Sequence, residues 1–171
     1  MKKAVLVSAA IFALMLSSCV SEPAPQEAPR AGVPPEVSKW NEEHGGDTFS
    51  GMGISTFDNE SDALQQATML ARQNLAASLE TEVAAISENY VQRSEANGET
   101  DRVAKFKDST KQLVNQTVSK SKTFGPYMND RGSTYIVVYL DKQSTQKDLS
   151  TYVDDIFSAT ESELNDMLGV N

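Results

Sequence analysis

The chain has 171 residues, of which 24 are acidic and 15 are basic, so its formal net charge is −9 at pH 7. This acidic balance argues against binding to nucleic acid and against electrostatic binding to anionic lipid. With one cysteine and one histidine, the chain has no internal disulfide and no ligand set for a zinc site.

The N-terminus has the features of a secretory signal. Two lysines precede a nearly unbroken apolar run, residues 4–16. This run is too short for a membrane-spanning helix and is typical of a signal-peptide core. It ends in the sequence LSSC, which resembles a bacterial lipobox, where the cysteine is lipidated and becomes the first mature residue. We therefore predict a lipoprotein signal peptide at residues 1–18 and lipidation at Cys19.

Lipidation of Cys19 predicts a lasting anchor, because each buried methylene group contributes about 0.8 kcal/mol. Val20 follows the cysteine, whereas the familiar signal for inner-membrane retention is an aspartate at that place. We therefore expect a palmitate-bearing protein of the bacterial outer membrane that faces the periplasm.

A proline-rich tether is predicted to follow. Residues 20–37 hold five of the six prolines and almost no apolar bulk, so this segment should stay extended and solvated. We assign residues 19–39 to the lipidated cysteine and the tether, and residues 40–171 to a single domain. Trp40 marks the expected entry into that domain, either at the edge of the core or as an exposed anchor.

The sequence FSGMGIST, within residues 48–57, predicts a strand with Gly51 and Gly53 on one face. Asp58, Asn59 and Ser61 then offer N-cap chemistry, and we interpret DNESD as a helix cap because it lacks the glycine and distal glutamate of a calcium loop. A long amphipathic helix is predicted by apolar residues at steps of three or four: Leu64, Ala67, Ala71, Leu75, Leu79, Val83, Ile86 and Tyr90.

The two glycines raise the possibility of a phosphate-binding loop. A dinucleotide-binding loop would need a third glycine at the start of the helix, and the sequence has none there. We therefore interpret Gly51 and Gly53 as a flat bed for the alanine-rich first turns of the helix.

The remaining elements follow from turn signals and periodicity. EANGET, residues 95–100, predicts a turn, and Val103, Phe106 and Leu113 mark the inner face of a second helix. Residues 118–130 alternate as in a strand, in which SKSK would lie on an exposed face, and residues 129–133 predict a hairpin turn.

Both faces of the strand predicted at residues 135–140 are apolar, with Tyr135, Val137 and Tyr139 on one and the residues between them on the other. It should therefore be central, covered on both sides. We expect the long helix on one face and a C-terminal helix on the other; if that helix turned away, the free face would be a partner site. The C-terminal helix is predicted from a second apolar stripe: Leu149, Tyr152, Val153, Ile156, Phe157, Leu164 and Met167.

A family resemblance rests on the order of these motifs. The chain resembles the Lpp-twenty family of bacterial envelope lipoproteins in the order of its features. These are a lipobox, a proline-rich tether, a tryptophan, GMGIST, the helix ALQQATMLARQNLAASLETEV and the late strand GSTYIVVYLDK. They are also similar to the N-terminal domain of flagellar assembly protein T. The family's helix and strand patterns correspond to these residues: Ala67, Ala71, Arg72, Leu75, Ala76, Gly132, Tyr135 and residues 136–138.

The resemblance covers residues 40–142. It implies an α+β domain, a helix pair on a small antiparallel sheet, in a membrane-anchored protein without known catalysis. Some members look like components or assembly aids of flagella. With the C-terminal stripe, the predicted fold is a sheet of about three strands against a long helix and a second helix, plus a C-terminal helix.

The side chains that could carry catalysis or bind a metal give little indication of a site. We expect His44, before two glycines, to be a solvated loop residue, and Arg72 to lie at the helix edge. The acidic pairs Asp154-Asp155 and Glu161/Glu163 fall on polar sides of helices, where solvation explains them. We therefore predict no enzyme, no catalytic or metal site and no cofactor, with a Ser/Lys hydrolase at SKSK as a minor alternative.

Two functional hypotheses follow. In the first, a lipid-anchored structural or assembly component works through other envelope proteins or self-association, without nucleic acid. In the second, the chain is a periplasmic small-molecule or glycan binding module. A concave pocket lined by Tyr127, Tyr135 or Trp40 would favour the second.

Overall fold

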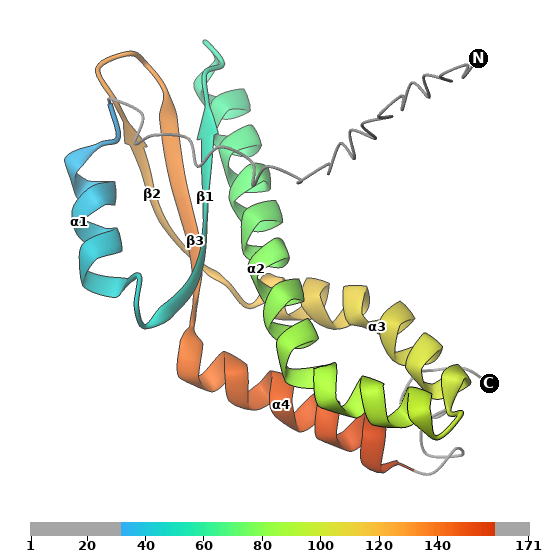
Figure 1. The fold of residues 1–171 in the computed structure, drawn as a ribbon. Helices are drawn as coiled ribbons and strands as arrows, with labels where there is room; N and C mark the ends of the chain where they lie inside the picture. The colour runs from blue at the N-terminus through green and yellow to red at the C-terminus, as the bar shows by residue number, and fades with distance from the viewer. Residues whose placement is uncertain (1–31, 160–171) are drawn as a thin grey trace, which may run out of the picture. The chain divides into compact units, whose positions relative to one another are not determined.

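Four helices and a three-stranded antiparallel sheet make up residues 32–159, the part of the chain that the computed structural model describes (Figure 1). Their order is α1 (Pro35–His44), β1 (Thr48–Ser55), α2 (Glu60–Ala96), α3 (Thr100–Ser119), β2 (Lys122–Met128), β3 (Thr134–Asp141) and α4 (Lys142–Ser158). This arrangement confirms the predicted α+β class. The predicted signal peptide, Cys19, most of the tether, and Glu161, Glu163, Leu164 and Met167 lie outside the described residues.

β3 is the central strand, as its two apolar faces predict. The strand order is β1-β3-β2, and both neighbours pair with β3 antiparallel. Ile136 and Val138 belong to a main core that also contains residues of α2, α3 and α4. Tyr135 and Val137 belong to a second cluster on the opposite face. Two separate layers therefore cover the sheet.

The glycine bed is confirmed. A Cβ on Gly53 would overlap the carbonyl oxygen of Ala67 and lie 2.6 Å from the amide nitrogen of Ala71. A Cβ on Gly51 would overlap the backbone of Ala71 and Leu75 in the same way. The absence of side chains at these two positions lets the backbone of α2 lie directly on β1.

The buried side of α2 rotates along the helix. Its buried positions recur every fourth residue: Ala63, Ala67, Ala71, Leu75, Leu79, Val83 and Ser87. Each four-residue step overshoots a full turn by about 40°, so the first half packs on the sheet and the second half faces α3 and α4 (Figure 1). Leu64, which we expected in the inner stripe, is exposed because Ala63 takes the inward position.

The cover of the outer face differs from the prediction. The cluster on that face is built from α1 and the sheet, not from the C-terminal helix. The Trp40 ring lies 5.6 Å from the Phe124 ring and 5.0 Å from the Tyr139 ring, centroid to centroid. Trp40 therefore belongs to the core, and α1 takes the place that we assigned to the last helix.

Helix α4 packs on the other side because of how it starts. Asp141 is both the last residue of β3 and the N-cap of α4, so no loop separates strand from helix. Without a connection to carry it round the sheet, α4 runs on from the end of β3 (Figure 1) and buries Leu149, Val153 and Ile156 in the main core.

Two element boundaries also differ. Helix α1 begins at Pro35, so the last residues assigned to the tether are helical; proline suits the first turn of a helix, and Val37 is buried there. Helix α3 continues to Ser119 because Val118 is buried, so the predicted strand starts only at Lys122. The sequence SKSK therefore spans a helix end and not an exposed strand face.

The predicted turns are confirmed. Helix α2 ends at Ala96, and Gly98 adopts φ +80° before α3 begins. In the β2–β3 turn, the Asn129 side chain accepts hydrogen bonds from the backbone N–H groups of Arg131 and Ser133. These side-chain contacts explain why asparagine suits the β2–β3 turn.

The N-cap of α4 gives a pH-dependent prediction. The Asp141 carboxylate accepts a 2.7 Å hydrogen bond from the Ser144 N–H, and this bond holds the pKa of Asp141 below the ordinary value of an aspartate. A lowered folded-state pKa stabilises the fold above the unfolded-state value, and this stabilisation is lost as the pH falls through the folded-state pKa. We expect Asp141→Ala to lower the melting temperature at pH 7 and to match the wild type more closely at pH 2.

Asp141→Asn is the matched control, because asparagine caps helices without titrating. It should stay close to the wild type at pH 7. A difference between Asp141→Ala and wild type that is constant from pH 7 to pH 2 would contradict the role of the charged cap.

Candidate functional site

The aromatic residues proposed for a ligand pocket pack against one another in one hydrophobic cluster. Trp40 and Tyr135 are buried together, and Tyr127 packs partly buried against their cluster. The Phe124 ring lies between Trp40 and Tyr127, 5.0 Å from the latter. These side chains form a hydrophobic layer under α1, in which they contact one another.

The reactive residues named from the sequence are dispersed. His44 is exposed and ends α1, where we expected a loop, and its ring lies 5.4 Å from Trp40. Arg72, Asp154 and Asp155 are exposed as well. Asn59 caps α2 by accepting from the Asp62 N–H, which confirms the capping role of DNESD. Within residues 32–159, no group of histidine, cysteine or carboxylate residues is arranged to hold a metal ion.

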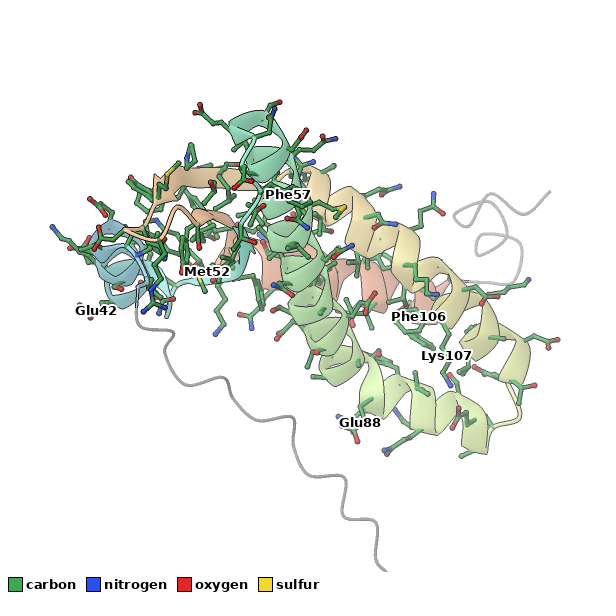
Figure 2. All side chains as sticks on the ribbon, turned by 90° about the horizontal axis from the view of Figure 1, so that it is seen from above. Glu42, Met52, Phe57, Glu88, Phe106 and Lys107 are labelled. Carbon is green, nitrogen blue, oxygen red and sulfur yellow. The ribbon has the colours of Figure 1, made fainter. Side chains whose placement is uncertain are left out.

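An open groove of about 660 Å³ lies between the C-terminal half of α2 and the middle of α3. We call it the α2–α3 groove. Figure 2 shows Phe106 and Lys107 of α3 on the side that faces α2, with Glu88 on α2. The groove is lined by Glu80, Val83, Ala84, Ala85, Ser87, Glu88, Val91, Gln92, Glu95, Phe106, Lys107 and Thr110.

Another side of this part of α2 is held by α4. The Tyr90 hydroxyl donates a 2.6 Å hydrogen bond to Asp154, and its ring stacks on Phe157 at 5.5 Å. This bond to a carboxylate raises the pKa of the Tyr90 hydroxyl above the ordinary value of a tyrosine. Because Tyr90 lies about 100° round the helix from Val91, α4 is fixed to another side of α2 and leaves the groove open.

The floor of the groove is mainly apolar, with the buried Ser87 among its side chains. Phe106 is buried, and its ring contacts Phe157 of α4 at 5.0 Å. Val83 is buried beside it, and Val91 and Ala84 continue the apolar surface along α2. The floor is therefore part of the domain core seen from outside, and its shape is fixed by packing on both helices.

The rim of the groove is acidic. Glu80, Glu88 and Glu95 are exposed along α2, whereas the cationic lining residue is Lys107 on α3. Lys107 lies 3.4 Å from Glu95 and pairs with it. Glu88 accepts a hydrogen bond from the neutral amide of Gln92. The three carboxylates each follow a buried residue of α2, namely Leu79, Ser87 and Ser94, so they lie along the same edge of its buried side.

Sequence reasoning missed this groove. Val83 and Phe106 were assigned to inner faces, and the glutamates were not distinguished from other exposed charges. The signal was present in the spacing of Glu80, Glu88 and Glu95, which places them along one side of a helix. These glutamates border a groove only because α3 packs beside that side of α2.

A second hollow, of about 290 Å³, lies between α3 and α4. Its lining mixes Lys120 with Asp148 and Asp155 and has less apolar surface. The α2–α3 groove, with an apolar floor and charge of predominantly one sign, is the stronger candidate for a binding surface.

No protein-family model matches this chain, and no curated protein matches it significantly. Among residues 32–159, none of the helices is both long enough and apolar enough to cross a membrane.

Proposed function

We propose that this chain is a lipid-anchored lipoprotein of the bacterial envelope that acts as a structural or assembly component through protein–protein contacts. The observation that carries the proposal is the α2–α3 groove, which combines a rigid apolar floor with an exposed acidic rim. Such a surface suits the side of another protein better than a small polar ligand, because it is open along its length.

The sequence supports the anchored part of this proposal. The lipobox at Cys19 and the proline-rich tether would place a folded domain at some distance from an outer membrane, on the periplasmic side. The resemblance to the Lpp-twenty family and to flagellar assembly protein T points the same way. A flagellar structure is accordingly one candidate for the assembly that the chain serves.

Photo-crosslinking in cells tests the proposal. A photoreactive amino acid is placed in the full-length chain at one of three exposed positions, Glu88 in the groove or Glu42 and Phe57 outside it (Figure 2). We expect irradiation to give a discrete adduct with an envelope protein from at least one position. The absence of protein adducts from all three positions would reject a role in protein contacts.

Cys19→Ser tests the anchor in the same cells. Because the serine hydroxyl is not the nucleophile that accepts the lipid in a lipobox, we expect this variant to leave the membrane fraction and to lose the adduct. If Cys19→Ser still fractionates with membranes, as measured by immunoblotting of separated fractions, the lipidation of Cys19 is refuted.

A further inference from the structure

We propose that the α2–α3 groove binds a basic amphipathic helix of a partner protein, with aliphatic side chains on the floor and lysine or arginine residues against the α2 rim. This inference rests on the proposed function and specifies the chemistry of the partner. It follows from the length of the groove, from the sign of its charges, and from the sequences that the chain itself could offer.

The length of the groove suits a helix. Its α2 wall runs from Glu80 to Glu95, a distance of about 22 Å at 1.5 Å per residue. A partner helix of about four turns would cover it, with apolar residues at every third or fourth position on the floor. Val83, Val91 and Phe106 give that apolar face its contacts.

The charges select the sign of the partner. Glu80 and Glu88 lie about two turns apart on the α2 rim, so basic residues about two turns apart on a partner helix would meet them. At the Glu95 end of the groove, Lys107 pairs with Glu95 and offsets its negative charge. The net negative charge of the rim is therefore greatest toward Glu80. Rim charges of this kind mainly steer association and select partners, and the floor supplies the apolar contact.

Three parts of the chain outside its core, namely the exposed Phe57, the C-terminal sequence and the tether, do not match a basic amphipathic helix. Its exposed Phe57 is flanked by Asp58 and followed by Glu60, so a second copy docking there would bring like charges to the rim. The sequence after α4, residues 160–171, contains three acidic residues and no basic ones. The tether has almost no large apolar residues. Charge complementarity therefore favours a basic partner over self-occupancy.

The test uses the full-length chain in neutral detergent and a fluorescein-labelled helical peptide of about 18 residues, with leucines on one face and lysines on its flanks. A second peptide carries glutamate in place of lysine. We expect fluorescence anisotropy at low salt to show saturable binding of the lysine peptide and none of the glutamate peptide. Added salt should weaken the binding, because exposed charges are screened over about 8 Å at physiological ionic strength.

Three variants locate the binding site. We expect Glu80→Lys with Glu88→Lys to weaken binding of the lysine peptide by about tenfold or more. Glu42→Lys with Glu43→Lys, the same charge change on the exposed side of α1, should retain most of the affinity. Ala84→Trp should block the floor without changing the charge, whereas Ala104→Trp, on α3 outside the groove, should bind as the wild type does.

Equal loss of affinity in the two charge-reversal pairs, or binding that Ala84→Trp leaves intact, would overturn the groove assignment. So would failure of the lysine peptide to bind, or equal binding of the glutamate peptide. If crosslinks still form in cells from positions outside the groove, the proposed function survives that failure; if no position gives a crosslink, the proposed function fails as well.

Two other occupants of the groove, a second copy of the chain and the chain's own C-terminal sequence, would each give a distinct experimental result. Self-association by light scattering that Ala84→Trp abolishes would assign the groove to a second copy. A carbodiimide crosslink between Lys107 and Glu161, Glu163 or Asp166 within one chain, displaced by the lysine peptide, would assign it to the chain's own C-terminal sequence. Either result would overturn the assignment to a partner protein.

Discussion

Gly53→Ala is expected to destabilise the domain by about 3 kcal/mol or more, because the added methyl group overlaps the backbone of α2 and not a side chain that could rotate away. The carbonyl oxygen of Ala67 and the amide nitrogen of Ala71 are fixed by the hydrogen bonds of α2, so relief requires the whole helix to move off β1. The measurement is urea unfolding followed by the fluorescence of Trp40, which is the chain's single tryptophan.

Gly46→Ala is the matched control for this substitution. A Cβ at Gly46 meets no atom within 4 Å, and we expect a change of no more than about 0.5 kcal/mol. Gly51→Ala should behave like Gly53→Ala, since its Cβ would overlap the backbone of Ala71 and Leu75. Near-equal unfolding midpoints for Gly53→Ala and Gly46→Ala would refute the close packing of α2 on β1.

Trp40→Ala is expected to destabilise the domain by about 3 to 4 kcal/mol, in the range for removal of a large buried aromatic side chain. The ring is 7% exposed and contacts Phe124 and Tyr139, so its loss opens a cavity between α1 and the sheet. Circular dichroism is the suitable measurement, because the variant lacks the tryptophan signal. Binding of a hydrophobic dye should rise as the outer face of the sheet is uncovered.

Lys39→Ala serves as the control on the same helix. Lys39 is exposed, and its 3.8 Å ion pair with Glu43 is also exposed, so we expect an effect below about 0.5 kcal/mol. Trp40→Phe should fall between the two, since a smaller ring fills part of the site. If Trp40→Ala were as stable as Lys39→Ala, α1 would not be part of the folded unit.

Local patterns were enough to predict most of the elements. The stepwise apolar residues of α2, the Asn97-Gly98 turn and the two apolar faces of β3 each carry their structural meaning within a few residues. The glycine bed followed as well, because two glycines on one strand face followed by alanines on a helix leave few other ways to pack. These features depend on periodicity and on small side chains, which the sequence displays directly.

The arrangement of the layers required the folded structure. The apolar stripe of α4 shows that one side of the helix is buried, but it does not show which element covers that side. The position of α4 against the main core follows from the absence of a loop after Asp141. Helix α1 was hidden by the prolines near its start, although Trp40 and Val37 supply its buried side. Which helix covers which face depends on the path of the chain between elements, and composition does not show that path.

The α2–α3 groove shows the same division between local and tertiary information. The sequence contains the row of glutamates on α2 and the aromatic side chain of Phe106, and it determines the helices that carry them. Only the packed structure brings the two together, because the buried side of α2 rotates toward α3 after leaving the sheet and Tyr90 fixes α4 elsewhere. Helical periodicity is a property of neighbouring residues, whereas a groove exists only where residues distant in the chain meet.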